Sequence, residues 1–163
     1  MPCQRPSRLF IMPNSFVFPY NIILKEDGVI ESVPVAEIGI KDKKGEWLSL
    51  FLIIDSGATL SALPKSDASV LGINVREGKQ MMISSISGEK LIGWQHQITA
   101  RIGNEILKFP LVFLDSDMTP RVLGRAGIFE NFLLVFEENE KRTGFVGGDQ
   151  KEAGTIHKIL DRI

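Results

Sequence analysis

The most constraining feature of this sequence is a continuous apolar run that stops at a carboxylate. Residues 47–54 read Trp-Leu-Ser-Leu-Phe-Leu-Ile-Ile, and Asp55-Ser56-Gly57-Ala58 follows directly. A run of this length predicts a strand buried on both faces. A carboxylate at the end of such a strand is costly unless neighbouring groups compensate for its burial. Gly57 permits a tight turn, while Ser56 and Thr59 supply hydroxyl groups.

Two interpretations of Asp55 follow from this context. An aspartate presented on a small-residue turn at a strand end suits acid–base chemistry on a bound water molecule. Alternatively, Asp55 caps the turn with its own side chain and has only a structural role. The tripeptide Asp-Ser-Gly is too short to decide between them, because such motifs recur by chance.

The rest of the chain predicts a mostly-β protein with few helices. Asp27-Gly28 between two β-branched segments predicts a hairpin over residues 21–30. Further strands are expected at 33–40, 79–86, 90–102, 105–114, 133–136 and 144–146. Short helices are expected at 64–71 and 125–132, and the tail at 147–163 has one apolar helical face formed by Ile156, Ile159, Leu160 and Ile163. We expect that face to fold back on the sheet or to extend a dimer interface. Residues 1–20 hold four prolines and predict an extended arm ahead of a domain at 21–146, and its aromatic side chains are expected to pack against some other surface.

Composition excludes several function classes. The chain has 163 residues, enough for one domain, and its 19 Lys and Arg against 20 Asp and Glu exclude nucleic-acid or membrane binding by bulk charge. Its one cysteine, Cys3, permits no internal disulfide, and His96 and His157 lack ligand spacing, so we expect no metal. We find no nucleotide-binding fingerprint and expect no cofactor. No apolar run is long enough to cross a bilayer and no signal peptide is evident, so a cytoplasmic location is expected.

A second motif gives Asp55 a context. Val122-Leu123-Gly124-Arg125 follows another apolar segment. Together with Leu52-Ile53-Ile54-Asp55-Ser56-Gly57-Ala58, it resembles the retropepsins, the aspartic proteases of retroviral type and their cellular relatives. The resemblance covers about residues 30–146 and implies an all-β fold, a small closed barrel with one or two short helices. It also implies a flap over the substrate, here formed by Ile83, Ser84, Ser85, Ile86, Ser87 and Gly88.

The resemblance implies a catalytic Asp55, supported on its turn by Ser56, Gly57, Ala58 and Thr59, with Gly124 and Arg125 in structural or dimer-forming roles. This chain has Thr59 where retroviral enzymes often carry an acidic residue, and Ala126 where the family often has Asp or Asn, so the partner of Arg125 is open. An aspartic protease needs two carboxylates that share one proton. The sequence has no second Asp-Thr/Ser-Gly, so a homodimer acting on an extended polypeptide is implied. The alternative is an inactive dimerisation or peptide-binding module of the same fold.

Overall fold

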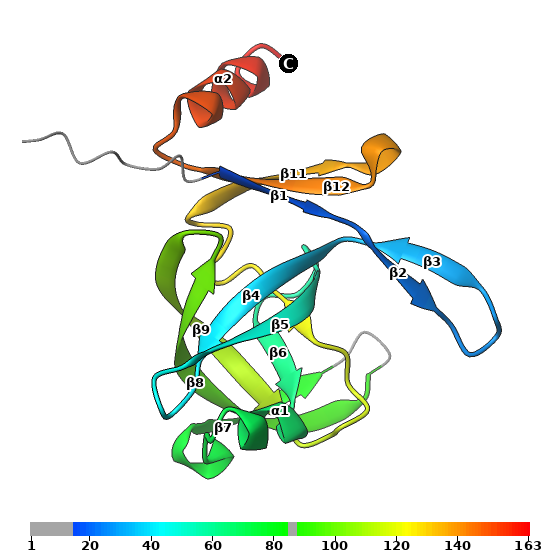
Figure 1. Ribbon diagram of the computed structural model, residues 1–163, viewed down its shortest axis with the longest axis vertical. Helices are drawn as coiled ribbons and strands as arrows, with labels where there is room; N and C mark the ends of the chain where they lie inside the picture. The colour runs from blue at the N-terminus through cyan, green and yellow to red at the C-terminus, as the bar shows by residue number, and fades with distance from the viewer. Residues whose placement is uncertain (1–14, 85–87) are drawn as a thin grey trace, which may run out of the picture.

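The strands form a curled seven-stranded sheet, a three-stranded sheet beside it and a separate two-stranded hairpin (Figure 1). The computed structural model describes residues 15–84 and 88–163. The curled sheet has the order β4-β5-β10-β6-β9-β8-β7, and an additional pairing of β4 with β8 connects its first strand to its far side. Its strands are β4 (Val35–Lys41), β5 (Trp47–Ile54), β6 (Ser61–Pro64), β7 (Lys79–Ser84), β8 (Lys90–Ile102), β9 (Glu105–Leu114) and β10 (Val122–Leu123).

The core lies inside the curl of this sheet. Fully buried side chains alternate along β4, as expected for a strand with one face turned inward, whereas the last four residues of β9 are all buried. The largest of them are Phe109, Phe113, Ile38, Ile40, Leu52 and Leu63. The helix α1 (Lys65–Val70), which was predicted at 64–71, packs against β6 and β9. The short 3-10 helix η1 (Val75–Glu77) precedes β7.

The three-stranded sheet joins both ends of the described chain. Its order is β1 (Ser15–Pro19), β12 (Arg142–Gly147) and β11 (Phe132–Glu137), with the 3-10 helix η2 (Glu138–Glu140) between the last two in sequence. Aromatic contacts pack β1 against the other two strands. The Phe18 ring packs edge-on against Phe145 with centroids 5.2 Å apart, and the Phe16 and Phe132 ring centroids are 6.4 Å apart. The end of the predicted arm therefore packs through its aromatic side chains, while residues 1–14 lie outside the described residues. The proposed division at residues 20 and 146 stays a prediction.

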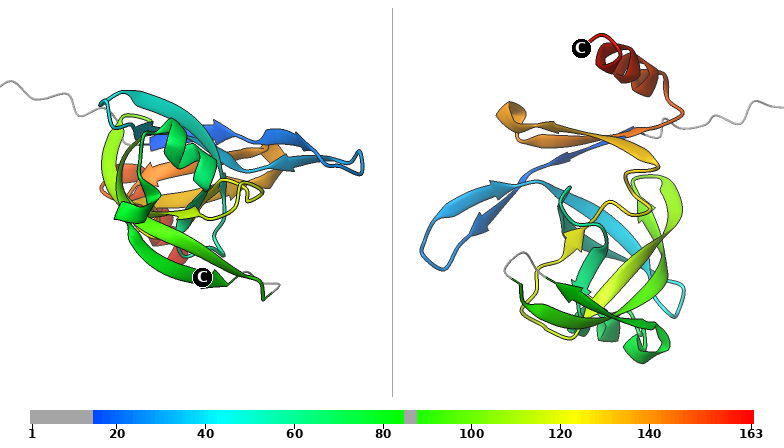
Figure 2. Two further views of the ribbon diagram at one scale, coloured as in Figure 1. Left: turned by 90° about the horizontal axis from the view of Figure 1, so that it is seen from below. Right: turned by 180° about the vertical axis from the view of Figure 1, so that it is seen from behind.

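The predicted hairpin is present and stands apart from both sheets. It consists of β2 (Asn21–Leu24) and β3 (Ile30–Val33), which pair only with each other within the described chain. Gly28 has φ +81°, the left-handed conformation that a tight Asp-Gly turn requires. All three views show the hairpin projecting from the junction between the two sheets (Figures 1 and 2).

Three local predictions were wrong. The helix predicted at 125–132 is absent: residues 125–131 form bends and turns and β11 begins at Phe132, because Gly127 adopts φ +74° and interrupts the helical backbone. The strand at Trp47–Ile54 is not buried on both faces, since Phe51 is 53% exposed. The helix α2 (Lys151–Leu160) does not fold back on the curled sheet; it lies beyond the three-stranded sheet and buries only Ala153 (Figure 2). Among the described residues, no helix is long and apolar enough to cross a membrane.

Candidate active site

Asp55 begins a turn whose backbone is fixed from both sides. Its N–H donates to the carbonyl of Leu123 at 3.0 Å, because β10 runs parallel to β5 and places Leu123 beside Ile54. Its carbonyl accepts from Ala58 N–H at 3.2 Å, which closes the turn. Its side chain accepts from Gly57 N–H through Oδ1 at 2.8 Å. The capping role considered for this residue is therefore present. It uses one carboxylate oxygen, Oδ1, and the side chain that carries both oxygens is exposed.

The second sequence motif holds the far end of the same turn. Arg125 N–H donates to the Ala58 carbonyl at 3.0 Å, and Ala126 N–H donates to the Thr59 carbonyl at 2.9 Å. Gly124 is buried against this segment: a Cβ there would come within 2.5 Å of the carbonyl carbon and oxygen of Leu60. No side chain fits in that space, which explains the glycine. The two motifs are thus parts of one hydrogen-bonded structure.

Ser61 also contributes to this structure, although no pattern in the sequence selects it. Its buried hydroxyl accepts from Gly124 N–H at 3.0 Å. A buried N–H without a partner costs free energy, so this serine stabilises the contact between the two motifs. A hydroxyl six residues after Asp55 is too common a feature to have identified it.

Arg125 contacts the residue that replaces the expected acid. Its Nη2 donates to Thr59 Oγ1 at 3.4 Å, a long hydrogen bond between two exposed side chains. No ion pair of Arg125 occurs among the described residues. The open question of its partner is therefore answered by a weak neutral contact, and Arg125 positions backbone more than it balances charge.

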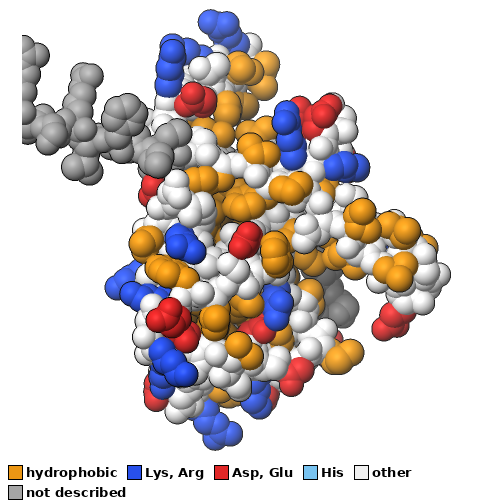
Figure 3. All heavy atoms as spheres, viewed as in Figure 1, with side chains coloured by type: hydrophobic (Ala, Val, Ile, Leu, Met, Phe, Trp, Pro, Cys, Tyr) orange, Lys and Arg blue, Asp and Glu red, His pale blue; other side chains and the backbone are white. Residues whose placement is uncertain are grey.

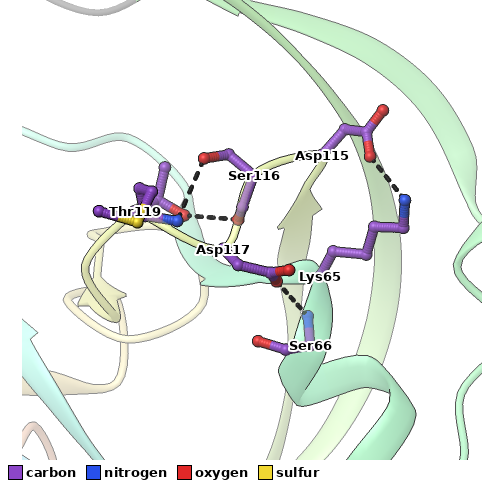
Figure 4. A network of polar contacts seen from close by, with 7 residues as sticks. Lys65, Ser66, Asp115, Ser116, Asp117 and Thr119 are labelled. Carbon is purple, nitrogen blue, oxygen red and sulfur yellow. Dashed lines mark hydrogen bonds and ion pairs between the residues drawn. The ribbon is translucent and has the colours of Figure 1, made fainter.

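Residues 114–117 read Leu-Asp-Ser-Asp and are the part of the chain most similar to a second Asp-Ser-Gly motif, although they lack the glycine. Their side chains have a structural role. Asp115 pairs with Lys65 at 2.8 Å, and Asp117 accepts from Ser66 N–H at 2.8 Å (Figure 4). Ser116 accepts from Met118 N–H at 3.3 Å and completes the loop. These side chains attach the loop to the start of α1. This stretch is therefore a surface turn, and Asp55 has no partner carboxylate in it.

An ion pair between a buried carboxylate and a partly exposed arginine lies beside this loop and was not predicted. Asp67 in α1 accepts from Arg121 Nε at 2.7 Å and from its Nη2 at 2.8 Å, a bidentate pair with the Asp67 side chain only 7% exposed. Hydrogen bonding to Asp67 raises the pKa of Arg121 further above its already high value. The pair fixes the segment that enters β10, and no spacing in the sequence joins residues so far apart.

The flap is described only at its two sides. Ile83 and Ser84 end β7 opposite Leu91 and Lys90 of β8, so the predicted hairpin has its expected strands. Gly88 has φ +84° and no atom within 4 Å of a Cβ position. Ser85, Ile86 and Ser87 lie outside the described residues, so the roles given to them stay predictions.

Metal-binding geometry is absent from the described part of the chain, where no group of three or more His, Cys, Asp or Glu side chains is placed to hold an ion. His96 instead contacts the Val75 carbonyl through Nε2 at 3.0 Å and packs edge-on against Phe113. These two contacts give His96 a structural role.

Comparison with known proteins places this turn in a family context. Residues 48–126, from β5 to the end of the second motif, match the model of the aspartyl protease family. The chain resembles the retropepsin-like aspartic proteases. The crystal structure of a retropepsin-like aspartic protease from Rickettsia conorii is similar with a TM-score of 0.56 and 17% sequence identity, over 80% of this chain and 97% of that one.

A protease of EIAV in complex with an inhibitor gives a TM-score of 0.45 and 20% identity, over 58% of this chain and 84% of that one. No curated protein matches the chain. The retropepsin-like fold and the mostly-β class predicted from the sequence are confirmed.

Proposed function

We propose that this protein is an aspartic endopeptidase that works as a homodimer, with Asp55 of each protomer forming a catalytic pair. The observation that carries the proposal is the Asp55 turn itself. Its backbone is held at Leu123 and Ala58, while its side chain is exposed and free to meet a second carboxylate. The aspartyl protease match covers this turn and both motifs.

The chemistry follows from two carboxylates held close together. Like charges at short range cannot both ionise, so the pair retains one proton. The ionised Asp55 accepts a proton from water, and the resulting oxygen attacks the scissile carbonyl carbon. The protonated partner's Asp55 donates its proton to the carbonyl oxygen as the carbon becomes tetrahedral. The carbon–nitrogen bond then breaks as the nitrogen takes up a proton, and no covalent enzyme intermediate forms.

The substrate class that fits is an extended polypeptide. The flap strands β7 and β8 and the Asp55 turn offer backbone N–H and carbonyl groups with which an extended chain can pair as an added strand. A flap closing over the peptide would exclude water other than the reacting molecule. A cytoplasmic location belongs to the same proposal.

The decisive experiment compares the wild type with Asp55→Asn on a diverse pool of unstructured peptides. We expect the variant to lose cleavage by about 10²- to 10⁴-fold, because it removes the general base and acid. The asparagine oxygen can still accept from Gly57 N–H, so thermal unfolding should change little. Asp115→Asn is the matched control, since it alters an exposed aspartate of the α1 loop and should retain activity. Full cleavage by Asp55→Asn would refute the proposal.

The pH profile tests the sharing of a proton. Cleavage should fall at low pH, where both carboxylates are protonated and none can accept a proton from water. It should also fall at higher pH, where both are ionised and none can donate one. A bell-shaped profile is expected for two carboxylates that share one proton. Cleavage that keeps rising through neutral pH would contradict a carboxylate pair.

The weak contact of Arg125 favours a second candidate, a peptide-binding module of the same fold without peptidase activity. An Arg held only by Thr59 at 3.4 Å leaves the turn less firmly braced than an ion pair would. Such a protein would dimerise and bind peptides without cleaving them. Peptide binding by both wild type and Asp55→Asn, with cleavage by neither, would establish it.

A further inference from the structure

We propose that the β2–β3 hairpin is an arm that clasps a second copy of this chain. The proposal rests on the proposed function, because a pair of Asp55 side chains requires that second copy. It adds a contact surface outside residues 48–126, the part matched to the aspartyl protease family.

The hairpin presents an apolar face that stays exposed within the described part of its own protomer. Ile22, Leu24 and Ile30 lie on one face of the two-stranded pairing, because Leu24 is opposite Ile30 and Ile22 is two residues away on the same strand. Their exposed fractions are 75%, 70% and 70%. Figure 3 shows hydrophobic atoms gathered along this projection. Large aliphatic side chains exposed together mark an interaction surface.

A permanent neighbour suits this hairpin better than a transient one. Two strands alone are marginally stable in water and need a further strand or a packed surface to persist. Within the described chain the hairpin is held by its turn and by the exposed Lys25–Glu31 ion pair at 2.7 Å. A peptide substrate leaves after each turnover, whereas a partner subunit stays. The occupant we infer is therefore a second copy.

The hairpin also continues into the surface beside the candidate active site. A groove of about 460 Å³ lies between it and the curled sheet, lined by Ile22 and Ile23 on one side and by Phe51 and Ile53 on the other. Ile53 is two residues before Asp55. The exposed Phe51 extends the apolar surface from the hairpin to the outer face of β5.

The direction of the hairpin agrees with a two-fold partner. The ends of β7 and β8 that flank the flap project to the same side of the molecule as the hairpin in all views (Figures 1 and 2). A partner placed on that side would meet the hairpin, Phe51 and the flap strands together. Because a two-fold interface uses the same patch on both copies, each protomer would clasp the other with its own hairpin.

The test is a charge placed on the apolar face of the arm. Ile22→Glu and Leu24→Glu in the full chain should each raise the dimer dissociation constant at least tenfold in sedimentation velocity over a concentration series. Ile106→Glu is the matched control, since Ile106 is an isoleucine of β9 with 62% exposure on a different part of the surface. It should dissociate like the wild type. Cleavage by the arm variants should fall at low concentration and recover, with an unchanged kcat, when the protein is concentrated.

A second measurement needs no substitution. Amide hydrogen exchange at residues 21–33 of the wild type should slow as concentration rises through the dimer range, while exchange in β9 should not change. Three results would contradict the proposal that the hairpin is a dimer arm. The first is an unchanged dissociation constant in both arm variants. The second is an increase in KM of those variants with the dimer intact, and the third is a loss of their thermal stability that is equal at all concentrations. The second would mean that the hairpin binds substrate, and the third that it packs on its own chain. A dimer that depends on the arm and cleaves nothing would instead refute only the peptidase.

Discussion

The Asp55 turn and the β2–β3 hairpin both contain a short turn that follows a strand. The first is stabilised by contacts with distant parts of the chain, and the second by contacts within itself. The Asp55 turn makes backbone hydrogen bonds to β10 and to the segment after it, and buried residues surround its base. The hairpin pairs only with itself among the described residues and exposes every residue of β2. The Asp55 turn makes its backbone hydrogen bonds within a single protomer, whereas the hairpin leaves an apolar face exposed.

The two glycines at these turns illustrate the difference. Gly124 is required for space, because any Cβ would collide with the Leu60 carbonyl. Gly28 is required for conformation, because φ is +81° although no atom lies within 4 Å of its Cβ position. A side chain added at Gly124 would therefore disturb the packed structure around Asp55, whereas one added at Gly28 would affect only the hairpin.

The largest stability effect is expected from Gly124→Ala. A methyl group 2.5 Å from main-chain atoms cannot be relieved by a side-chain rotation, so the two motifs must separate. We expect a loss of about 3 kcal/mol in the free energy of unfolding, at the upper end of typical overpacking costs. Urea denaturation measures it. Gly154→Ala in α2 is the control, because its Cβ position is open and alanine favours a helix; it should be neutral or stabilising.

A smaller loss is expected when the ion pair beside the site is removed. Asp67→Ala leaves the Arg121 guanidinium without its two hydrogen bonds and empties a buried position, which should cost about 2–3 kcal/mol. Asp115→Ala breaks the exposed pair with Lys65 and should cost less than about 1 kcal/mol. Thermal unfolding of both variants gives the comparison. Equal losses would show that burial of Asp67 contributes nothing.

The smallest global effect is expected from Gly28→Ala. The left-handed conformation costs an alanine about 1–2 kcal/mol, but that strain falls on a hairpin that makes few contacts with the core. Global stability of the dilute protein should change by less than about 0.5 kcal/mol, while hydrogen exchange at residues 21–33 accelerates. A loss as large as that of Gly124→Ala would mean that the hairpin is part of the cooperative core.

The sequence predicted well where local chemistry is decisive. The strand ending at Asp55, the flap strands, the Asp-Gly hairpin and the helix after Pro64 all appear near their expected positions. Each depends on a turn residue or on an uninterrupted β-rich segment. The joining of the Asp55 motif to Gly124-Arg125 followed from resemblance to a family, not from any local pattern.

What the sequence could not supply depends on contacts between distant residues. The Asp67–Arg121 pair and the Ser61–Gly124 bond join residues 54 and 63 positions apart. The turns that follow Arg125 were mistaken for a helix because the apolar spacing suits one. Gly127 was a signal against a helix. In the structure a Cβ at this position would lie 2.4 Å from Phe109. The exposure of α2 reflects the lack of a facing surface, which spacing on one helix cannot reveal.

The same long separations affect when the site takes shape during synthesis. The groups that hold the Asp55 turn, from the Leu123 carbonyl to Ala126 N–H, are encoded more than 60 residues after it. A growing chain emerges from the ribosome with its N-terminal part first, so the carboxylate turn lacks these long-range hydrogen bonds until the later segment is released. A chain truncated before residue 122 keeps Asp55 and the hydrogen bonds within its turn, but it lacks those that join the turn to β10 and to the segment after it. Maturation of the site is therefore coupled to completion of the sheet.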